Sequence, residues 1–291
     1  MICNLCPRRC NALRTESENK DGFCKMPLRV KIARADLHFW EEPCISHKNG
    51  SGTVFFSGCN LSCVYCQNFD VSHKCKGKEI TVEELAGIFK MLEEKGAHNI
   101  NLVTPTHYAL VIKEALEIYK PGIPVVYNSG GYERTETLKM LEGLIDVFLL
   151  DLKYVSEERA LRYSDAYDYP QYAQNAILEA CRQRPECLFS GGVMQKGVII
   201  RHLLLPQGTK EAMAVFDWVR DNAKNAYFSI MSQYIPVGNA ADYKEINRKV
   251  TKREYDKVLD YICSFDFQNI YIQEKSSADK KFIPDFINPS Y

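Results

Sequence analysis

Nothing in this sequence marks the chain for a membrane or for export. No stretch approaches the run of about 20 apolar residues that a membrane-spanning helix needs, and residues 1–10 contain no apolar core that could serve as a secretory signal. Internal repeats, low-complexity tracts and long linkers are missing as well. With 46% hydrophobic and 25% charged residues, the 291-residue chain can instead bury a substantial core. We therefore expect a cytoplasmic globular protein rather than a fibrous or disordered one.

The chain also lacks net charge. Its 37 Lys and Arg residues balance 37 Asp and Glu residues, so the whole molecule has no field that would draw it to nucleic acid or to an anionic membrane. The local balance differs, because residues 1–35 carry eight basic and three acidic side chains. A nucleic-acid partner is disfavoured for the chain as a whole but stays open through its basic N-terminus.

Cysteine, by contrast, is abundant, with twelve residues. A secreted disulfide scaffold is normally short and rich in loops, whereas this chain is long and apolar, so metal or redox roles in a reducing cytosol are favoured. Seven of the twelve fall into two tight groups: Cys3, Cys6, Cys10 and Cys24, then Cys59, Cys63 and Cys66.

From residue 52 onward, short β-rich runs alternate with amphipathic helical segments. The runs are rich in Val, Ile, Leu and Phe rather than strictly alternating, which is typical of parallel strands buried on both faces. This order predicts a wound α/β fold, either an open or closed barrel or a doubly wound sheet. The predicted strands cover residues 52–56, 99–103, 123–127, 146–151, 197–205, 227–233 and 269–273.

Two helices have strong start signals. Thr81 with Glu84, and Thr251 with Glu254, have the spacing of a capping box. Gly96 can end the first of these helices, and residues 210–222 fit another amphipathic helix.

The chain divides most naturally near residue 45. Residues 36–52 are the best candidate for a join, because they contain Pro43 and a polar stretch before the first predicted strand of the main domain. We predict a Cys-rich N-terminal metal-binding module over residues 1–45 and an α/β domain over residues 46–291.

Cys59, Cys63 and Cys66 follow a predicted strand with C-x3-C-x2-C spacing. Three thiolates this close can converge on one centre, and soft thiolates select iron-sulfur clusters or zinc. A structural zinc site normally has four protein ligands, whereas a cluster held by three leaves one iron open to bind a small molecule. We favour a cluster over three buried thiols or an incomplete zinc knuckle.

The same segment resembles the signature of the radical S-adenosylmethionine (SAM) superfamily, in which an aromatic residue, here Tyr65, precedes the last cysteine. The wider run Phe-Phe-Ser-Gly-Cys, continued by Tyr-Cys-Gln-Asn, is similar to the pyruvate formate-lyase activating enzyme branch. The resemblance implies a 4Fe-4S cluster on the three cysteines whose fourth iron binds S-adenosyl-L-methionine. Reductive cleavage of that cofactor then yields a 5′-deoxyadenosyl radical, which abstracts hydrogen from a substrate. The implied fold is a partial (β/α)6 barrel.

Polar residues at the ends of the later strands are candidate cofactor contacts, since ligands of parallel α/β folds bind at the carboxyl ends of strands. Each has a simpler account as a helix cap, a turn or a solvated ion pair. The resemblance favours cofactor contact: the Asp-Leu-Lys segment matches one that contacts the methionine part of the cofactor, and Arg201 falls where a cofactor-contacting arginine sits. The candidates are Tyr65, Thr104, Asn128, Ser129, Asp151, Lys153 and Arg201.

Cys3, Cys6, Cys10 and Cys24 supply four thiolates, enough for a tetrahedral zinc site or a second 4Fe-4S cluster. Free thiols are the alternative, but a basic segment of about 25 residues has too little core to order itself alone. This layout resembles a group catalogued as pyruvate formate-lyase activating enzymes, whose substrates are largely unassigned.

Three functions follow from these features. We favour a radical SAM oxidoreductase that acts on a protein or peptide, with activation of a glycyl radical enzyme as the named example and a flavodoxin- or ferredoxin-type electron donor. Radical modification of RNA, docked through the basic N-terminus, is the second. A non-catalytic iron-sulfur or zinc module is the third, and the missing fourth cysteine beside Cys66 argues against it.

Overall fold

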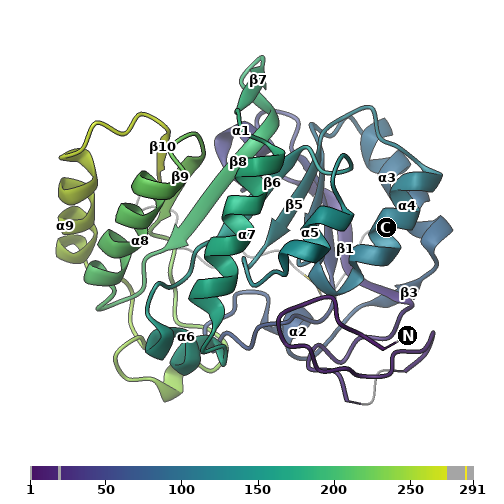
Figure 1. Ribbon diagram of the computed structural model, residues 1–291, viewed down its shortest axis with the longest axis horizontal. Coiled ribbons are helices and arrows are strands. Elements are labelled where there is room, and N and C mark those ends of the chain that lie inside the picture. The colour runs from purple at the N-terminus through teal and green to yellow at the C-terminus, as the bar shows by residue number, and fades with distance from the viewer. Residues whose placement is uncertain (1, 19–20, 274–285, 287–291) are drawn as a thin grey trace.

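The computed structural model describes residues 2–18, 21–273 and 286. These residues form one ten-stranded sheet in the order β10-β9-β8-β6-β5-β4-β2-β1-β3, with β7 paired to β8 (Figure 1). The strands are β1 (Val30–His38), β2 (Ser51–Phe56), β3 (Lys78–Ile80), β4 (Ile100–Val103), β5 (Val125–Ser129), β6 (Val147–Asp151), β7 (Leu188–Ser190), β8 (Val193–Leu203), β9 (Tyr227–Met231) and β10 (Ile270–Ile272).

Neighbouring strands from β2 to β10 along this path are parallel. Within the described residues the sheet stays open, because β10 and β3 end it without pairing to each other. This confirms the prediction of an α/β fold with an open, partial barrel. Each of the seven predicted strands overlaps an observed one, although β5 begins two residues later than the predicted run at 123.

The helices are α1 (Pro43–Ser46), α2 (Phe69–Ser72), α3 (Val82–Glu94), α4 (Ala109–Ile118), α5 (Thr135–Met140), α6 (Glu157–Ser164), α7 (Tyr169–Gln183), α8 (Thr209–Asn222) and α9 (Lys252–Cys263). Both predicted capping boxes are formed, by Thr81 with Glu84 and by Thr251 with Glu254. Gly96 has a φ of +81° just after α3, as a helix-ending glycine requires. No helix in the described ranges combines the length and the apolar character needed to cross a membrane.

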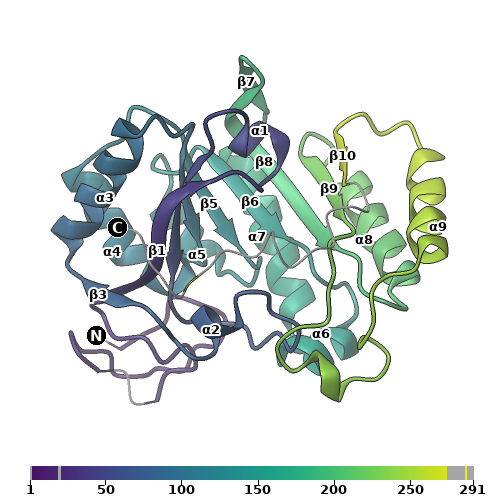
Figure 2. The same cartoon turned by 180° about the vertical axis from the view of Figure 1, so that it is seen from behind.

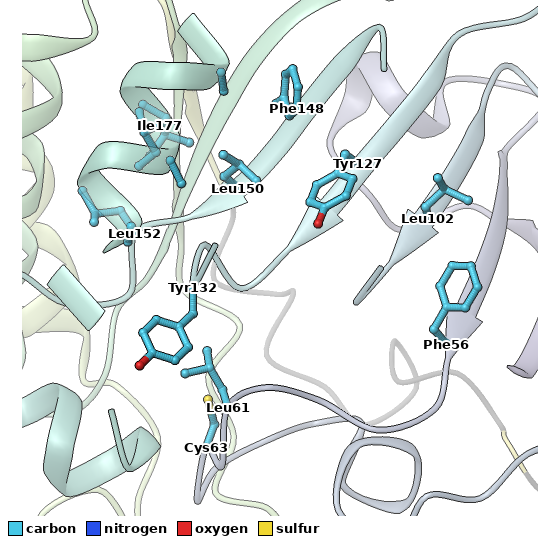
Figure 3. Packing of buried hydrophobic residues seen from close by; sticks show 14 of the residues in the cluster. Phe56, Leu61, Cys63, Leu102, Tyr127, Tyr132, Phe148, Leu150, Leu152 and Ile177 are labelled. Carbon is cyan, nitrogen blue, oxygen red and sulfur yellow. The ribbon is translucent and has the colours of Figure 1, made fainter. Parts of the chain in front are cut away.

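The two faces of the sheet are covered differently. Tyr127, Phe148 and Leu150 point to the face that carries the longer helices, where Ile177 of α7 packs (Figure 3). On the opposite face, the short helix α1 lies across the sheet (Figure 2). Its Ile45 is fully buried in a cluster with Val126, Val147, Leu149 and Ile199, so α1 closes the N-terminal half of that face.

Strand β1 was not predicted. It pairs antiparallel with β2, with Asp36 opposite Thr53, and β3 pairs antiparallel with β1. The segment from residue 30 therefore extends the sheet, although we had assigned it to the N-terminal module. The boundary at residue 45 stays a prediction.

Candidate functional site

The three cysteines of the C-x3-C-x2-C segment lie in the loop between β2 and α2, which we call the cysteine loop (residues 57–68). Each sulfur has a hydrogen-bonding neighbour. The backbone N–H of Leu61 donates to Cys59 Sγ at 3.4 Å, and Ser72 Oγ donates to Cys66 Sγ at 3.2 Å. Ser164 Oγ lies 3.0 Å from Cys63 Sγ. Such donors stabilise thiolates, the form in which cysteine binds iron or zinc.

Burial opposes ionisation of Cys59 and Cys66. It raises the pKa of Cys66 to about 11, and together with the charge of Cys63 it raises the pKa of Cys59 still further. Without a metal the protein thus keeps Cys59 and Cys66 protonated at neutral pH, whereas metal ligation removes their protons. The donor set fits an iron-sulfur cluster held by three thiolates.

No three His, Cys, Asp or Glu side chains converge tightly enough to hold a single metal ion anywhere in the described residues. In a 4Fe-4S cluster each thiolate binds a different iron, so the sulfurs of a cluster site lie further apart than the ligands of one ion. The three cysteines nevertheless lie within electrostatic reach of one another, since Cys63 and Cys66 both raise the pKa of Cys59, after burial.

A buried network of charged side chains lies at the carboxyl ends of β5, β6 and β8. Arg201 donates from Nε to Asp151 at 2.9 Å and from Nη2 to Asn128 at 2.6 Å. Lys153 donates to the other carboxylate oxygen of Asp151 at 2.5 Å. Four of the seven predicted cofactor contacts therefore lie together, because their strands are neighbours in register.

The charges of this network reach the cysteine loop. Burial alone would lower the pKa of Lys153, but the charges of Asp151 and Cys63 raise it above its ordinary value. Burial would likewise raise the pKa of Asp151, but Arg201 and Lys153 hold it below its ordinary value. Asp151 and Lys153 are therefore both ionised at neutral pH, with the cation beside Cys63.

Sequence reasoning missed two further members, Glu41 and Glu42, which follow β1. Glu41 accepts from Arg201 Nη1 and from Asn128 Nδ2, both at 3.1 Å. Glu42 lies 3.9 Å from Arg201, and its buried Oε2 has no hydrogen-bond partner among the residues that the structure describes. Burial raises the pKa of Glu42 to about 7. We name these charged and polar residues the strand-end network: Glu41, Glu42, Asn128, Asp151, Lys153 and Arg201. Glu41 and Glu42 are far from the other members in the sequence, so no sequence pattern linked them to the site.

The other predicted contacts are arranged around this network. Thr104 follows β4 with a φ of +60°, a strained conformation for a β-branched residue, and its N–H donates to the carbonyl of Asn128 at 2.8 Å. Ser129 Oγ accepts from Gly131 N at 3.2 Å. Both residues belong to the strand ends, and their contact with a cofactor stays a prediction.

Tyr65 is buried and joins a chain of hydroxyl groups that leads to the cysteine loop. Its OH lies 2.6 Å from that of Tyr154, which lies 2.9 Å from Ser164 Oγ. Ser164 in turn contacts Cys63, so Tyr65 is linked to a cysteine sulfur through two hydroxyls.

The four N-terminal cysteines are also neighbours. Cys3, Cys6 and Cys24 are buried and Cys10 is half-buried. After burial, the charges of Cys24 and Cys3 further raise the pKa of Cys6, and those of Cys3 and Cys10 raise that of Cys24. The backbone N–H groups of Arg8 and Met26, two residues after Cys6 and Cys24, act against the rise in the pKa of those thiols. In the cysteine loop the N–H of Leu61, two residues after Cys59, likewise donates to the Cys59 sulfur.

Glu133, between β5 and α5, is a second buried acid that sequence reasoning missed. It accepts from Thr106 Oγ1 at 2.6 Å and from Tyr127 OH at 3.1 Å. Burial raises its pKa to about 7, and its charge contributes to the raised pKa of Cys6. Glu133 therefore lies near the N-terminal cysteines.

Comparison with known proteins adds three findings. Residues 53–218 match the family described as the radical SAM superfamily. An uncharacterized protein of Methanocaldococcus jannaschii is 32% identical over 280 residues, which cover 92% of this chain and 76% of that protein. A pyruvate formate-lyase-activating enzyme of Clostridium pasteurianum is 31% identical over 114 residues, which cover 36% of this chain and only 46% of that enzyme.

Among solved structures, that of SuiB of Streptococcus suis bound to the precursor peptide SuiA shares the fold. The TM-score is 0.54 with 16% sequence identity, over 80% of this chain and 51% of that chain. The present chain thus spans about half the length of SuiB, and the likeness concerns the fold alone.

Proposed function

Since this chain belongs to the radical SAM superfamily, whose members bind a 4Fe-4S cluster and S-adenosyl-L-methionine, we propose that it uses them to abstract hydrogen from a protein or peptide. A reduced cluster would supply the electron that splits the cofactor into methionine and a 5′-deoxyadenosyl radical. The observation that carries the proposal is the buried loop of Cys59, Cys63 and Cys66, with a hydrogen-bonding neighbour at each sulfur and the ammonium of Lys153 nearby.

Each residue of the site would have its own role. The three cysteines would hold three irons and leave the fourth open to the cofactor. Lys153 and Arg201 would pair with the cofactor carboxylate, and Asp151 would accept from its ammonium or a ribose hydroxyl. Glu41 would hold Arg201 in place, because it accepts from the same guanidinium. Tyr65, Thr104, Asn128 and Ser129 would line the same site.

Two similarities support a protein or peptide substrate. The match to the Clostridium pasteurianum enzyme favours activation of a glycyl radical enzyme. SuiB, which shares the fold, was solved bound to the precursor peptide SuiA, and this supports a peptide as the substrate class. A flavodoxin- or ferredoxin-type protein would supply the electron. Of the two metals predicted for the four N-terminal cysteines, a second cluster is favoured over zinc, because among the described residues these cysteines do not converge as tightly as the ligands of one ion.

The test is an anaerobic reaction of the reconstituted protein with dithionite and S-adenosyl-L-methionine, followed by chromatographic measurement of 5′-deoxyadenosine. We expect 5′-deoxyadenosine from the wild type and none above background from Cys63→Ala, because removal of one thiolate ligand disrupts the cluster. Cys263→Ala, at an exposed cysteine at the end of α9, is the matched control and should behave as the wild type. Full cleavage by Cys63→Ala would overturn the cluster assignment.

A further inference from the structure

The N-terminal cysteines and the cysteine loop are joined by one residue, Arg8, which lies between Cys6 and Cys10. Burial raises the pKa of the Cys6 thiol, and the backbone N–H of Arg8 acts against that rise. The Arg8 side chain reaches the cysteine loop, where Nε donates to the carbonyl of Asn60 at 2.9 Å. Arg8 thus lies beside a candidate ligand of one centre and contacts the loop of the other.

Two rings hold the Arg8 guanidinium in this position. It lies 3.7 Å from the ring centre of Phe23, the residue before Cys24, and 5.3 Å from that of Tyr132. A guanidinium stacked on aromatic faces keeps its planar set of donors in a fixed orientation. The contact with Phe23 ties the Arg8 side chain to the second half of the N-terminal cysteine group.

The groups that Arg8 contacts lie beside the sulfurs of the cysteine loop. Asn60 directly follows Cys59, and the other guanidinium nitrogens donate to the carbonyls of Ser164, at 3.4 Å, and Asp165. The hydroxyl of Ser164 is the group 3.0 Å from Cys63 Sγ. A displacement of Arg8 would therefore move the surroundings of two of the three cysteines.

A second contact lies at the start of the cysteine loop. Gly58, directly before Cys59, has a φ of +79°, and a Cβ there would come within 2.7 Å of the Cys24 carbonyl and 2.4 Å of Met26 Cγ. The backbone segment that follows Cys24 therefore packs directly on the cysteine loop. Figures 1 and 2 both show the N-terminal segment (dark purple) beside α2, which follows this loop.

A third contact runs through Arg14, which is only 1% exposed. Its Nη1 donates to Cys3 Sγ at 3.7 Å and to the carbonyl of His107 at 2.6 Å. The ring of His107 contacts the carbonyl of Ser57 at 2.7 Å. The segment that carries the N-terminal cysteines thus contacts residues 58 and 60 directly and residue 57 through His107.

A segment this short gains most of its order from the metal that it binds, because the free energy of binding is also free energy of folding. We infer that a metal centre on Cys3, Cys6, Cys10 and Cys24 sets the position of the cysteine loop, and that Arg8 is the positioning residue that couples the two. This coupling rests on the proposed function, since it regulates the same cluster. Loss of the N-terminal metal would impair the cluster without touching its ligands.

Four full-length variants test the coupling: Arg8→Ala, Arg8→Lys, Cys6→Ser and the double variant Arg8→Ala with Cys6→Ser. Arg9→Ala is the matched control, because Arg9 is the neighbouring residue and its side chain is exposed. Zinc and iron are quantified in each anaerobically purified protein. Electron paramagnetic resonance of the reduced protein is recorded with and without S-adenosyl-L-methionine, and hydrogen exchange is measured over residues 57–68.

We expect Arg8→Ala to keep the N-terminal metal, since it keeps the backbone N–H, yet to shift the cluster spectrum and reduce cofactor cleavage by about tenfold. Arg8→Lys should recover part of this loss. Cys6→Ser should lose the N-terminal metal and show the same spectral shift, and the double variant should be no worse than Cys6→Ser, because both changes break one link. An unchanged spectrum in Cys6→Ser after loss of its metal, or Arg8→Ala indistinguishable from Arg9→Ala, would overturn the coupling.

Hydrogen exchange separates this coupling from the proposed function. The proposed function fails if the wild type makes no 5′-deoxyadenosine and its paramagnetic resonance spectrum does not change when the cofactor is added. The coupling is then tested by hydrogen exchange alone. Exchange over residues 57–68 that is about tenfold faster in Arg8→Ala and Cys6→Ser than in Arg9→Ala supports it, and equal exchange overturns it.

Discussion

The strand-end network and the N-terminal cysteine segment both lie near the cysteine loop but are positioned in different ways. The network stands on adjacent parallel strands whose register fixes Asn128, Asp151 and Arg201 over a buried core. The N-terminal segment is attached by the packing of Cys24 and Met26 and by polar contacts such as Arg8 to Asn60 and Arg134 to the carbonyl of Asn4. The sheet itself positions the network, whereas we expect the position of the N-terminal segment to depend on what its cysteines bind.

This difference indicates which part of the molecule can respond to a regulatory signal. A site fixed by sheet register keeps its geometry over a wide range of conditions, whereas a metal-dependent segment responds to metal supply and oxidation. The cysteine loop contacts the N-terminal segment through Arg8, and its cluster would therefore report on the state of that segment.

Alanine substitutions at two glycines, one beside each region, should show the largest difference in stability. A Cβ at Gly131, whose φ is +80°, would lie 2.1 Å from the carbonyl oxygen of Asp151 in the rigid network. We expect Gly131→Ala to cost about 3 kcal/mol or more in free energy of unfolding, from backbone strain and overpacking together. Gly58→Ala, which combines a φ of +79° with a clash against the N-terminal segment, should cost about 2 kcal/mol.

Urea unfolding measures both changes. Gly143→Ala is the control, since Gly143 has a φ of +86° but open space around its Cβ position, and it should cost about 1 kcal/mol. A larger loss at Gly58 than at Gly131 would show that the N-terminal segment is the more rigid of the two.

Asp151→Ala should reduce affinity for S-adenosyl-L-methionine by about tenfold to a hundredfold, because Lys153 and Arg201 lose the carboxylate that orients them. Equilibrium dialysis measures the affinity. Iron content should stay at the wild-type value, since no cysteine is changed. An unchanged affinity would remove Asp151 from the proposed site.

Glu42→Gln should have the smallest effect, a change in the pH dependence of stability. The pKa of Glu42 is raised from 4.5 to about 7, so the native state binds its proton more tightly and the wild type loses stability as pH rises from about 5 to 8. Because glutamine does not titrate, the variant should lose about 1–3 kcal/mol less stability than the wild type over this pH range. Thermal unfolding across this pH range measures it, and parallel curves for the two proteins would contradict the raised pKa.

The sequence predicted those features whose cause is local. The capping boxes at Thr81 and Thr251 depend on residues three apart, and the polar strand ends at Asn128 and Asp151 follow from the position of the apolar runs. Strand β1 was missed because its partner β2 is antiparallel and lies beyond the helix α1. The contacts of Arg8 and Glu41 were missed for a related reason. Each is a charged residue near a cysteine or a proline, and the local sequence does not identify a partner that lies far along the chain.

The ion pair between Glu41 and Arg201 joins residues 160 positions apart. A nascent chain that has emerged only as far as β6 already contains every cysteine of the loop, together with Asp151 and both glutamates. It still lacks the guanidinium of Arg201, which pairs with all three. Synthesis thus orders the assembly of this site in time. The proposed ligands for iron come early, and the ion pairs of the strand-end network are completed only when β8 joins the sheet.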